Sequence, residues 1–218
     1  LKREYSTGWI TNYTAGGGLS DDEGLYLGRL FALRFSDNSR FTAFANANNI
    51  SEDATGHGDG EWRVNSSNSG QQRFVNGGLN WTVNDPDNKL SNEMNLTARH
   101  QRQNLETRTL SESYLTAGNT FGRDLSQSRS KNLSVNFSDR FFLKVPFRWV
   151  SNLKGNFSQN LRNSNGTALT AADQALGDTV NFTSNRGNVT SRTLGLSWNH
   201  DFDFKLSTGD VFHFNVNA

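Results

Sequence analysis

The stretch that decides the fold is TLGLSWNHDFDFKLSTGD, residues 193–210. Its alternate positions differ sharply in polarity. One set consists of Leu194, Leu196, Trp198, Phe202, Phe204 and Leu206, with His200 as its only polar member, and the other of Thr193, Gly195, Ser197, Asn199, Asp201, Asp203 and Lys205. Successive side chains of a β-strand point to opposite faces. The pattern therefore predicts a long strand with one apolar and one polar face, followed by a turn at 207–210.

The composition limits what kind of chain can carry such a strand. Only 33% of the 218 residues are hydrophobic, yet 11% are aromatic. A packed globular protein has roughly 45–50% apolar residues, and a disordered chain has few aromatic ones. Neither class fits, because the small apolar content is concentrated in large rings. We therefore expect the apolar face of the strand to lie against something other than a globular core.

Charge, cysteine content and apolar run length exclude several function classes. The net charge is +1, and no block of Lys and Arg is present, so a nucleic-acid partner is not expected. The absence of cysteine excludes disulfides, thiolate catalysis and cysteine-based zinc sites. No apolar run is long enough for a transmembrane helix. Since both ends of the chain read as strands and no signal peptide opens it, we interpret the sequence as a fragment of a longer chain.

Three further segments repeat the pattern of strand, tight turn and strand. They cover residues 25–50, 75–98 and 133–157, with turns at 37–39, 84–88 and 145–148 that contain Asp, Asn, Ser or Pro. We expect about nine strands, most of about 10–15 residues, which is twice the average for globular proteins. Three polar segments, 51–70, 105–127 and 163–188, are expected to be long loops at the opposite end from the turns, and 168–176 could form a short helix.

Long alternating strands, tight turns at one end and long polar loops at the other are typical of bacterial outer-membrane barrels. A strand tilted by about 45° crosses the hydrocarbon core with about 9–11 residues, and closure pairs every backbone amide. The expected fold is all-β: part of an antiparallel up-and-down transmembrane β-barrel, with short periplasmic turns and long extracellular loops. We place it in the cell outer membrane, with lipid as a partner and residues 1–218 in a single barrel domain.

Some residues support this interpretation, and two do not fit it directly. Aromatic residues near strand ends could form the interfacial girdle of a barrel; they are Trp9, Tyr13, Trp81, Phe147, Trp149 and Trp198. Arg29 and Asp139 fall on the apolar side of their strands. Either a β-bulge changes the register there, or the two side chains reach the membrane interface.

No catalytic, metal or cofactor site is expected. Asp53, His57, Asp59 and Glu61 could hold a divalent cation, but their spacing does not match a calcium-binding loop, and a solvated loop fits better. His100, His200 and His213 lie on different strands, and neither a serine nor an acid stands out as a partner for His100. The sequence therefore gives no support for an enzyme.

The segments YLGRLFALRFSDNSRFTAFANANNISE, DRFFLKVPFRWVSNLKGNFSQNLRN and LGLSWNHDFDFKLSTGD resemble the C-terminal barrel portion of TonB-dependent receptor-like proteins of Bacteroidota. The resemblance implies a barrel of about 22 strands around a plug, of which this chain would supply something under half. The plug and N-terminal domains are absent from these residues. The implied partners are the remainder of the barrel and its plug, TonB, and a surface lipoprotein.

The expected function is uptake of a nutrient across the outer membrane, with a glycan, a peptide or a metal chelate as candidates. Trp62, Tyr114 and Arg123 are the candidate ligand-binding residues, because each lies in an expected extracellular loop and aromatic rings can stack on sugars. Two alternatives remain: a non-transporting surface or adhesion barrel, which would lack a plug, and a soluble all-β binding module. An isolated piece with two unpaired edges is expected to fold poorly by itself.

Overall fold

The computed structural model describes residues 7–20, 23–56, 61–66, 70–116, 118–145, 147–206 and 208–218. Within these residues it has eleven β-strands and no α-helix. The strands are β1 (Gly8–Leu19), β2 (Gly24–Phe35), β3 (Ser39–Asn48), β4 (Glu52–Gly56), β5 (Trp62–Ser66), β6 (Gln71–Asn84), β7 (Leu90–Ser113), β8 (Thr120–Leu143), β9 (Arg148–Ala171), β10 (Thr179–Lys205) and β11 (Val211–Asn217). None of the described residues forms a helix that could span a membrane.

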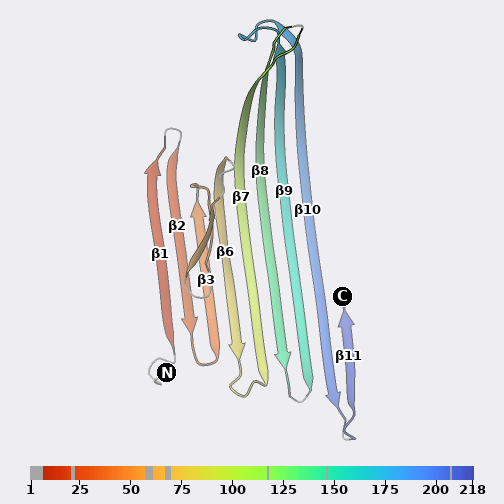
Figure 1. The fold of residues 1–218 in the computed structure, drawn as a ribbon. Helices are drawn as coiled ribbons and strands as arrows, with labels where there is room; N and C mark the ends of the chain where they lie inside the picture. Colours follow the sequence, from red (N-terminus) through yellow and green to blue (C-terminus); the bar gives the residue numbers. More distant parts are fainter. Residues whose placement is uncertain are drawn as a thin grey trace.

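Nine of the strands form one antiparallel sheet in the order β1-β2-β3-β6-β7-β8-β9-β10-β11 (Figure 1). Each strand pairs with its neighbour along the chain, except that the separate hairpin β4–β5 is inserted between β3 and β6. The predicted all-β, antiparallel, up-and-down order of nine strands is confirmed. The sheet is open, with β1 at one edge and β11 at the other.

The four predicted tight turns coincide with short connections between consecutive strands, all at one end of the sheet (Figure 1); Pro146 and Ser207, in the third and fourth of them, lie outside the described residues. The turns connect β2 to β3, β6 to β7, β8 to β9, and β10 to β11. In the second of them, Asp85 accepts hydrogen bonds from the amides of Asp87 and Lys89 at 3.3 and 3.4 Å. This is the local backbone bonding for which aspartate is favoured in turns.

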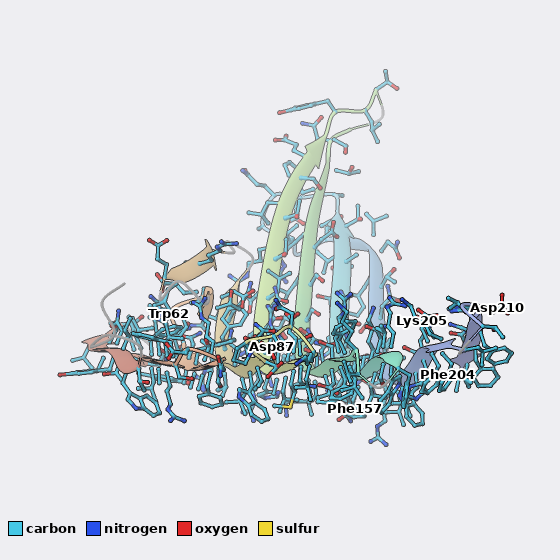
Figure 2. The ribbon with its side chains drawn as sticks, turned by 90° about the horizontal axis from the view of Figure 1, so that it is seen from below. Trp62, Asp87, Phe157, Phe204, Lys205 and Asp210 are labelled. Carbon is cyan, nitrogen blue, oxygen red and sulfur yellow. The ribbon has the colours of Figure 1, made fainter. Side chains whose placement is uncertain are left out.

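The prediction of long loops at 105–127 and 163–188 is wrong. Residues 105–113 and 120–127 lie in β7 and β8, and residues 163–171 and 179–188 lie in β9 and β10. These four strands have 24 to 27 residues and extend far beyond β1, β2, β3 and β6 (Figure 1). The short helix expected at 168–176 is also wrong, because β9 continues to Ala171 and a turn follows it. Figure 2 shows that the two tall hairpins lean toward the side of the sheet that carries Trp62.

Cross-strand register divides the side chains between two faces. We call the face with Thr42, Asn80, Asn95 and Asn136 the polar face. Thr42 lies opposite Asn80, and Asn80 lies opposite Asn95. Asn95 lies opposite Ser138, and Asn136 is the next residue of β8 on the same face. The opposite, apolar face carries the remaining alternate residues. The predicted apolar stripe of β10 lies there, and Figure 2 shows Phe157 on this side, away from Trp62.

The apolar residues of this face form a band next to the turns. The band covers residues 75–83 in β6, 90–98 in β7, 133–143 in β8, 149–157 in β9 and 194–204 in β10. Trp9, Trp81 and Trp198 occupy one row of directly opposed positions across the sheet. Beyond the band, polar residues predominate on both faces of the tall hairpins, with scattered apolar ones such as Leu110, Leu125 and Phe182. The band therefore has a defined upper edge, near His100 and Leu133, which face each other.

The strand register is regular at Arg29 and Asp139, so the suggestion of a β-bulge at either residue is wrong. Arg29 lies on the polar face, where it pairs with Glu52. The neighbouring Phe31 and Leu33 on that face are almost fully buried, with 0% and 6% exposure. Asp139 does lie on the apolar face, where it accepts a hydrogen bond of 2.8 Å from the side-chain amide of Asn92.

The sheet has little core of its own. Few apolar residues of the described chain are deeply buried: Phe31, Ala54 and Phe74 lie in or near the β4–β5 hairpin, and Leu33, Val150 and Ala171 lie elsewhere in the sheet. The accessible surface is 15087 Å², whereas a compact protein of 24.3 kDa exposes about 10,000 Å². A sheet normally buries its apolar face against a second layer. Here the described residues supply such a layer only over part of the polar face.

Candidate functional site

The β4–β5 hairpin lies on the polar face and covers part of β2, β3 and β6. Its contacts with the sheet involve β3 and β6 through β4, and Figure 2 shows Trp62 of β5 on this side of the sheet. The predicted loop 51–70 therefore contains a folded hairpin. It is the only part of the described chain that forms a second layer.

Asparagine side chains anchor the hairpin to the sheet. The Asn48 amide nitrogen donates to the carbonyl of Glu52 at 2.7 Å, and its oxygen accepts from the backbone amides of Ile50 and Glu52. Asn76 donates to the carbonyl of Ala54 at 2.8 Å. β4 pairs with β5 along one edge and, in the described part of the chain, has no neighbouring strand along its other edge. The asparagine side chains take the place of that strand, so that buried backbone groups of β4 still have hydrogen-bond partners.

Two ion pairs fix the hairpin from either side. Arg29 of β2 pairs with Glu52, and Arg99 of β7 pairs with Asp53 at 2.9 Å. The Arg29 and Asp53 side chains are only 13% and 17% exposed. Removing one partner of such a pair leaves a charge with little access to water, which is strongly destabilising.

Aromatic packing completes the attachment. The Trp62 ring meets the Phe44 ring edge to face with centroids 6.1 Å apart, and the Arg29 guanidinium lies 5.5 Å from the Trp62 centroid. Phe44 in turn lies over Gly78, where an added Cβ would approach its ring to 2.5 Å. Glycine at position 78 therefore makes room for the ring on the polar face. The indole nitrogen of Trp62 is buried and has no hydrogen-bond partner among the described residues.

Beside the hairpin, the polar face contains a groove of about 450 Å³. Most of its lining residues carry a hydroxyl, amide or guanidinium group, but more of the lining surface is apolar than polar, with Phe44 as its aromatic wall; the polar members are Arg40, Thr42, Thr55, Asn80, Thr82, Asn95 and Thr97. The Thr42 hydroxyl is buried and unpaired among the described residues. Closely spaced hydroxyl and amide groups next to one ring favour a ligand with many hydroxyl groups and an apolar face.

The structure does not bring the three predicted ligand residues together. Trp62 lies on the polar face next to the groove. Tyr114 is 76% exposed beyond the end of β7. Arg123 lies within β8, directly opposite Leu110, on the apolar-face side of a tall hairpin. Its expected place in a loop is therefore wrong, because β8 begins at Thr120.

Sequence reasoning missed the groove residues, although one signal was present. Phe44 is an aromatic residue among the polar alternate positions of β3. Such a side chain on a polar face requires a local cover, and the hairpin provides it. The threonines and asparagines of the groove carried no signal, because equally polar residues recur along the whole polar face.

The titratable side chains of the described residues form no metal centre, and the histidine–carboxylate pair among them is His213 with Asp203, whose carboxylate also pairs with Arg148. Asp53 is engaged by Arg99, His57 and Asp59 lie outside the described residues, and no group of three or more His, Asp or Glu side chains converges elsewhere in the described ranges. Ser151 and His200 face each other on the apolar face, but the indoles of Trp198 and Trp149 donate to them at 3.2 and 3.1 Å. Each is thus held by a tryptophan.

Comparison of the chain with models of known protein families, with curated proteins and with solved structures found no match.

Proposed function

We propose that the chain is part of an outer-membrane β-barrel that takes up a nutrient, with the polar face toward the lumen and the apolar face toward lipid. The observation that carries the proposal is the apolar band. On β6, β7, β8 and β10 it has the length of about 9–11 residues that a tilted strand needs to cross the hydrocarbon core.

The exposed area supports the same proposal. Apolar side chains of the band are open to solvent, including Leu194 at 81% and Leu196 at 74%. Contiguous exposed apolar surface on this scale marks an interaction site. Lipid covers a band of constant height along all strands, whereas a protein partner would cover a patch.

The groove beside the β4–β5 hairpin supports a ligand site within the lumen. Among a glycan, a peptide and a metal chelate, a glycan fits best, because hydroxyl and amide groups surround one aromatic ring in the groove. We assign recognition to the groove, with Thr97 and Asn95 of β7 as ligand contacts and Phe44 as the ring against which a sugar face packs.

The proposal is tested with the complete protein in its membrane. Thr97→Val and Asn95→Ala remove hydrogen-bonding groups from the groove without touching the hairpin anchors. Each should weaken oligosaccharide binding about fivefold, measured by titration of tryptophan emission, since one hydrogen bond contributes about 1 kcal/mol. Thr109→Val, on the same face of β7 but above the groove, is the matched control. Equal affinities for all variants would refute the groove as the ligand site.

A non-transporting surface barrel is the second candidate, and the tall hairpins favour it. β7, β8, β9 and β10 continue well past the band with polar residues on both faces (Figure 1), which suits a projecting binding platform. Uptake of labelled oligosaccharide by cells distinguishes the two: shortening both hairpins to the band edge should leave uptake measurable if the groove serves transport.

A further inference from the structure

Basic side chains gather on the apolar-face side of the sheet, directly above the band. Arg73 of β6 lies opposite Arg102 of β7, and Arg102 lies opposite Lys131 of β8. Arg129 is the next residue of β8 on the same face. Together with Asn104 they line a groove of about 380 Å³.

This arrangement is unfavourable without an anion. Directly opposed side chains have Cβ atoms about 4.5–5.5 Å apart, and like charges at that spacing destabilise a sheet. Arg73 is paired with Glu23, and the Arg102 Nε donates to His100 Nε2 at 3.1 Å, which leaves its charge unneutralised. Within the described ranges, no carboxylate forms an ion pair with Arg102, Arg129 or Lys131.

The cluster has a defined height. The pair His100 and Leu133 lies one alternate position below Arg102 and Lys131, and Ala98 and Val135 of the band lie one further below. If the band spans the hydrocarbon core, these cations lie at the level of the lipid headgroups, in the leaflet on the side of the tall hairpins.

We propose that Arg102, Arg129 and Lys131 bind the phosphate groups of an anionic lipid in that leaflet, an inference that rests on the proposed membrane function. A guanidinium forms paired hydrogen bonds with two phosphate oxygens, and an ammonium adds a compact charge. Free phosphate offers the same oxygens, but the acyl chains of a lipid would also lie along the band directly below the cluster.

The test uses the complete protein in phosphatidylcholine nanodiscs, with bis-phosphorylated lipid A as the probe and native mass spectrometry as the readout. The triple variant R102Q/R129Q/K131Q should bind lipid A on the order of a hundredfold more weakly, since each cation near a membrane surface contributes about fivefold. The control R108Q/R162Q/R186Q removes the same charge. Arg162 lies opposite Ser130 at the height of the cluster but on the polar face, and Arg108 and Arg186 lie higher.

Retained affinity in the control with loss in the triple variant supports the proposal. Equal affinity of the triple variant and the wild type overturns it. Inorganic phosphate that binds the wild type as tightly as lipid A does would overturn the assignment to lipid. Failure of the wild type to insert into phosphatidylcholine at all would instead refute the membrane function, so the two failures are distinguishable.

Discussion

An arginine placed on the apolar band should reveal whether the band lies in lipid. Leu196 of β10 and Leu110 of β7 are on the same face and are almost equally exposed, at 74% and 75%. They differ in height, since Leu196 is within the band and Leu110 is far above it. In water, Leu196→Arg and Leu110→Arg would both change stability by less than about 0.5 kcal/mol.

The depth of Leu196 sets the expected cost in a bilayer. It lies two residues inside the upper band edge at Leu194, which is about 6.6 Å along the strand and about 5 Å in depth at a tilt of about 45°. Arginine on the lipid face costs about 2–4 kcal/mol at the midplane and about 0–1 kcal/mol at the interface. We expect about 2 kcal/mol for Leu196→Arg and less than 1 kcal/mol for Leu194→Arg.

The assay is reversible urea titration of the complete protein in phosphatidylcholine vesicles, followed by tryptophan emission. The expected order of destabilisation is Leu196→Arg, then Leu194→Arg, then Leu110→Arg with no measurable loss. Equal free energies of unfolding for the Leu196 and Leu110 variants would refute the reasoning, because an arginine within the band, opposite Gly155, would then cost no more than one placed opposite Arg123 far above it.

Two further predictions concern the β4–β5 hairpin and the tip of the β9–β10 hairpin. Gly78→Ala places a Cβ against the Phe44 ring and should lower the free energy of unfolding by about 1–3 kcal/mol in the same titration. Gly28→Ala is the control, because its added Cβ meets nothing closer than 3.9 Å. Equal losses of stability in the two variants would contradict the packing of Phe44 on Gly78. The Asp178 amide bonds Asp173 at 2.7 Å and holds the pKa of that carboxyl below its model-compound value of 3.8. This stabilisation of the tip is complete above pH about 4 and is lost as the pH falls through the lowered pKa. The NMR chemical shift of the Asp178 amide should therefore change with pH with a midpoint below 3.8. A midpoint above that value would refute the role of this hydrogen bond.

The strand order and the turns could be predicted because alternation and turn chemistry are local signals. In β10 every second residue from Leu194 to Phe204 lies on one face as the pattern indicated. The upper halves of the tall hairpins could not be recognised in the same way. Polar residues predominate on both of their faces, as at Arg186 and Asn188 of β10 against Asn185 and Gly187, so little alternation in polarity remains and the segment resembles a loop.

The candidate site escaped prediction because it depends on contacts between distant residues. The β4 strand has only five residues, and it is held by Arg29, Asn76 and Arg99, which come from three other strands. The same contacts explain why the apolar side of β2 was assigned to the wrong face. Phe31 is buried on the polar face next to Gly56 of this hairpin, which only the position of the hairpin could reveal.

The two edges of the sheet impose a condition on the membrane proposal. In hydrocarbon every backbone amide and carbonyl needs an internal partner, but among the described residues β1 has a neighbouring strand on one side only, and so does β11. The amide and carbonyl of Trp198 bond those of Ala218 at 2.8 Å, and residues 179–197 of β10 have no partner strand on that side within the described chain. Further strands must therefore pair with both edges before the band can enter lipid. The same requirement gives the edges a role in assembly, because a partner strand along β10 would also brace the tall β9–β10 hairpin above the band.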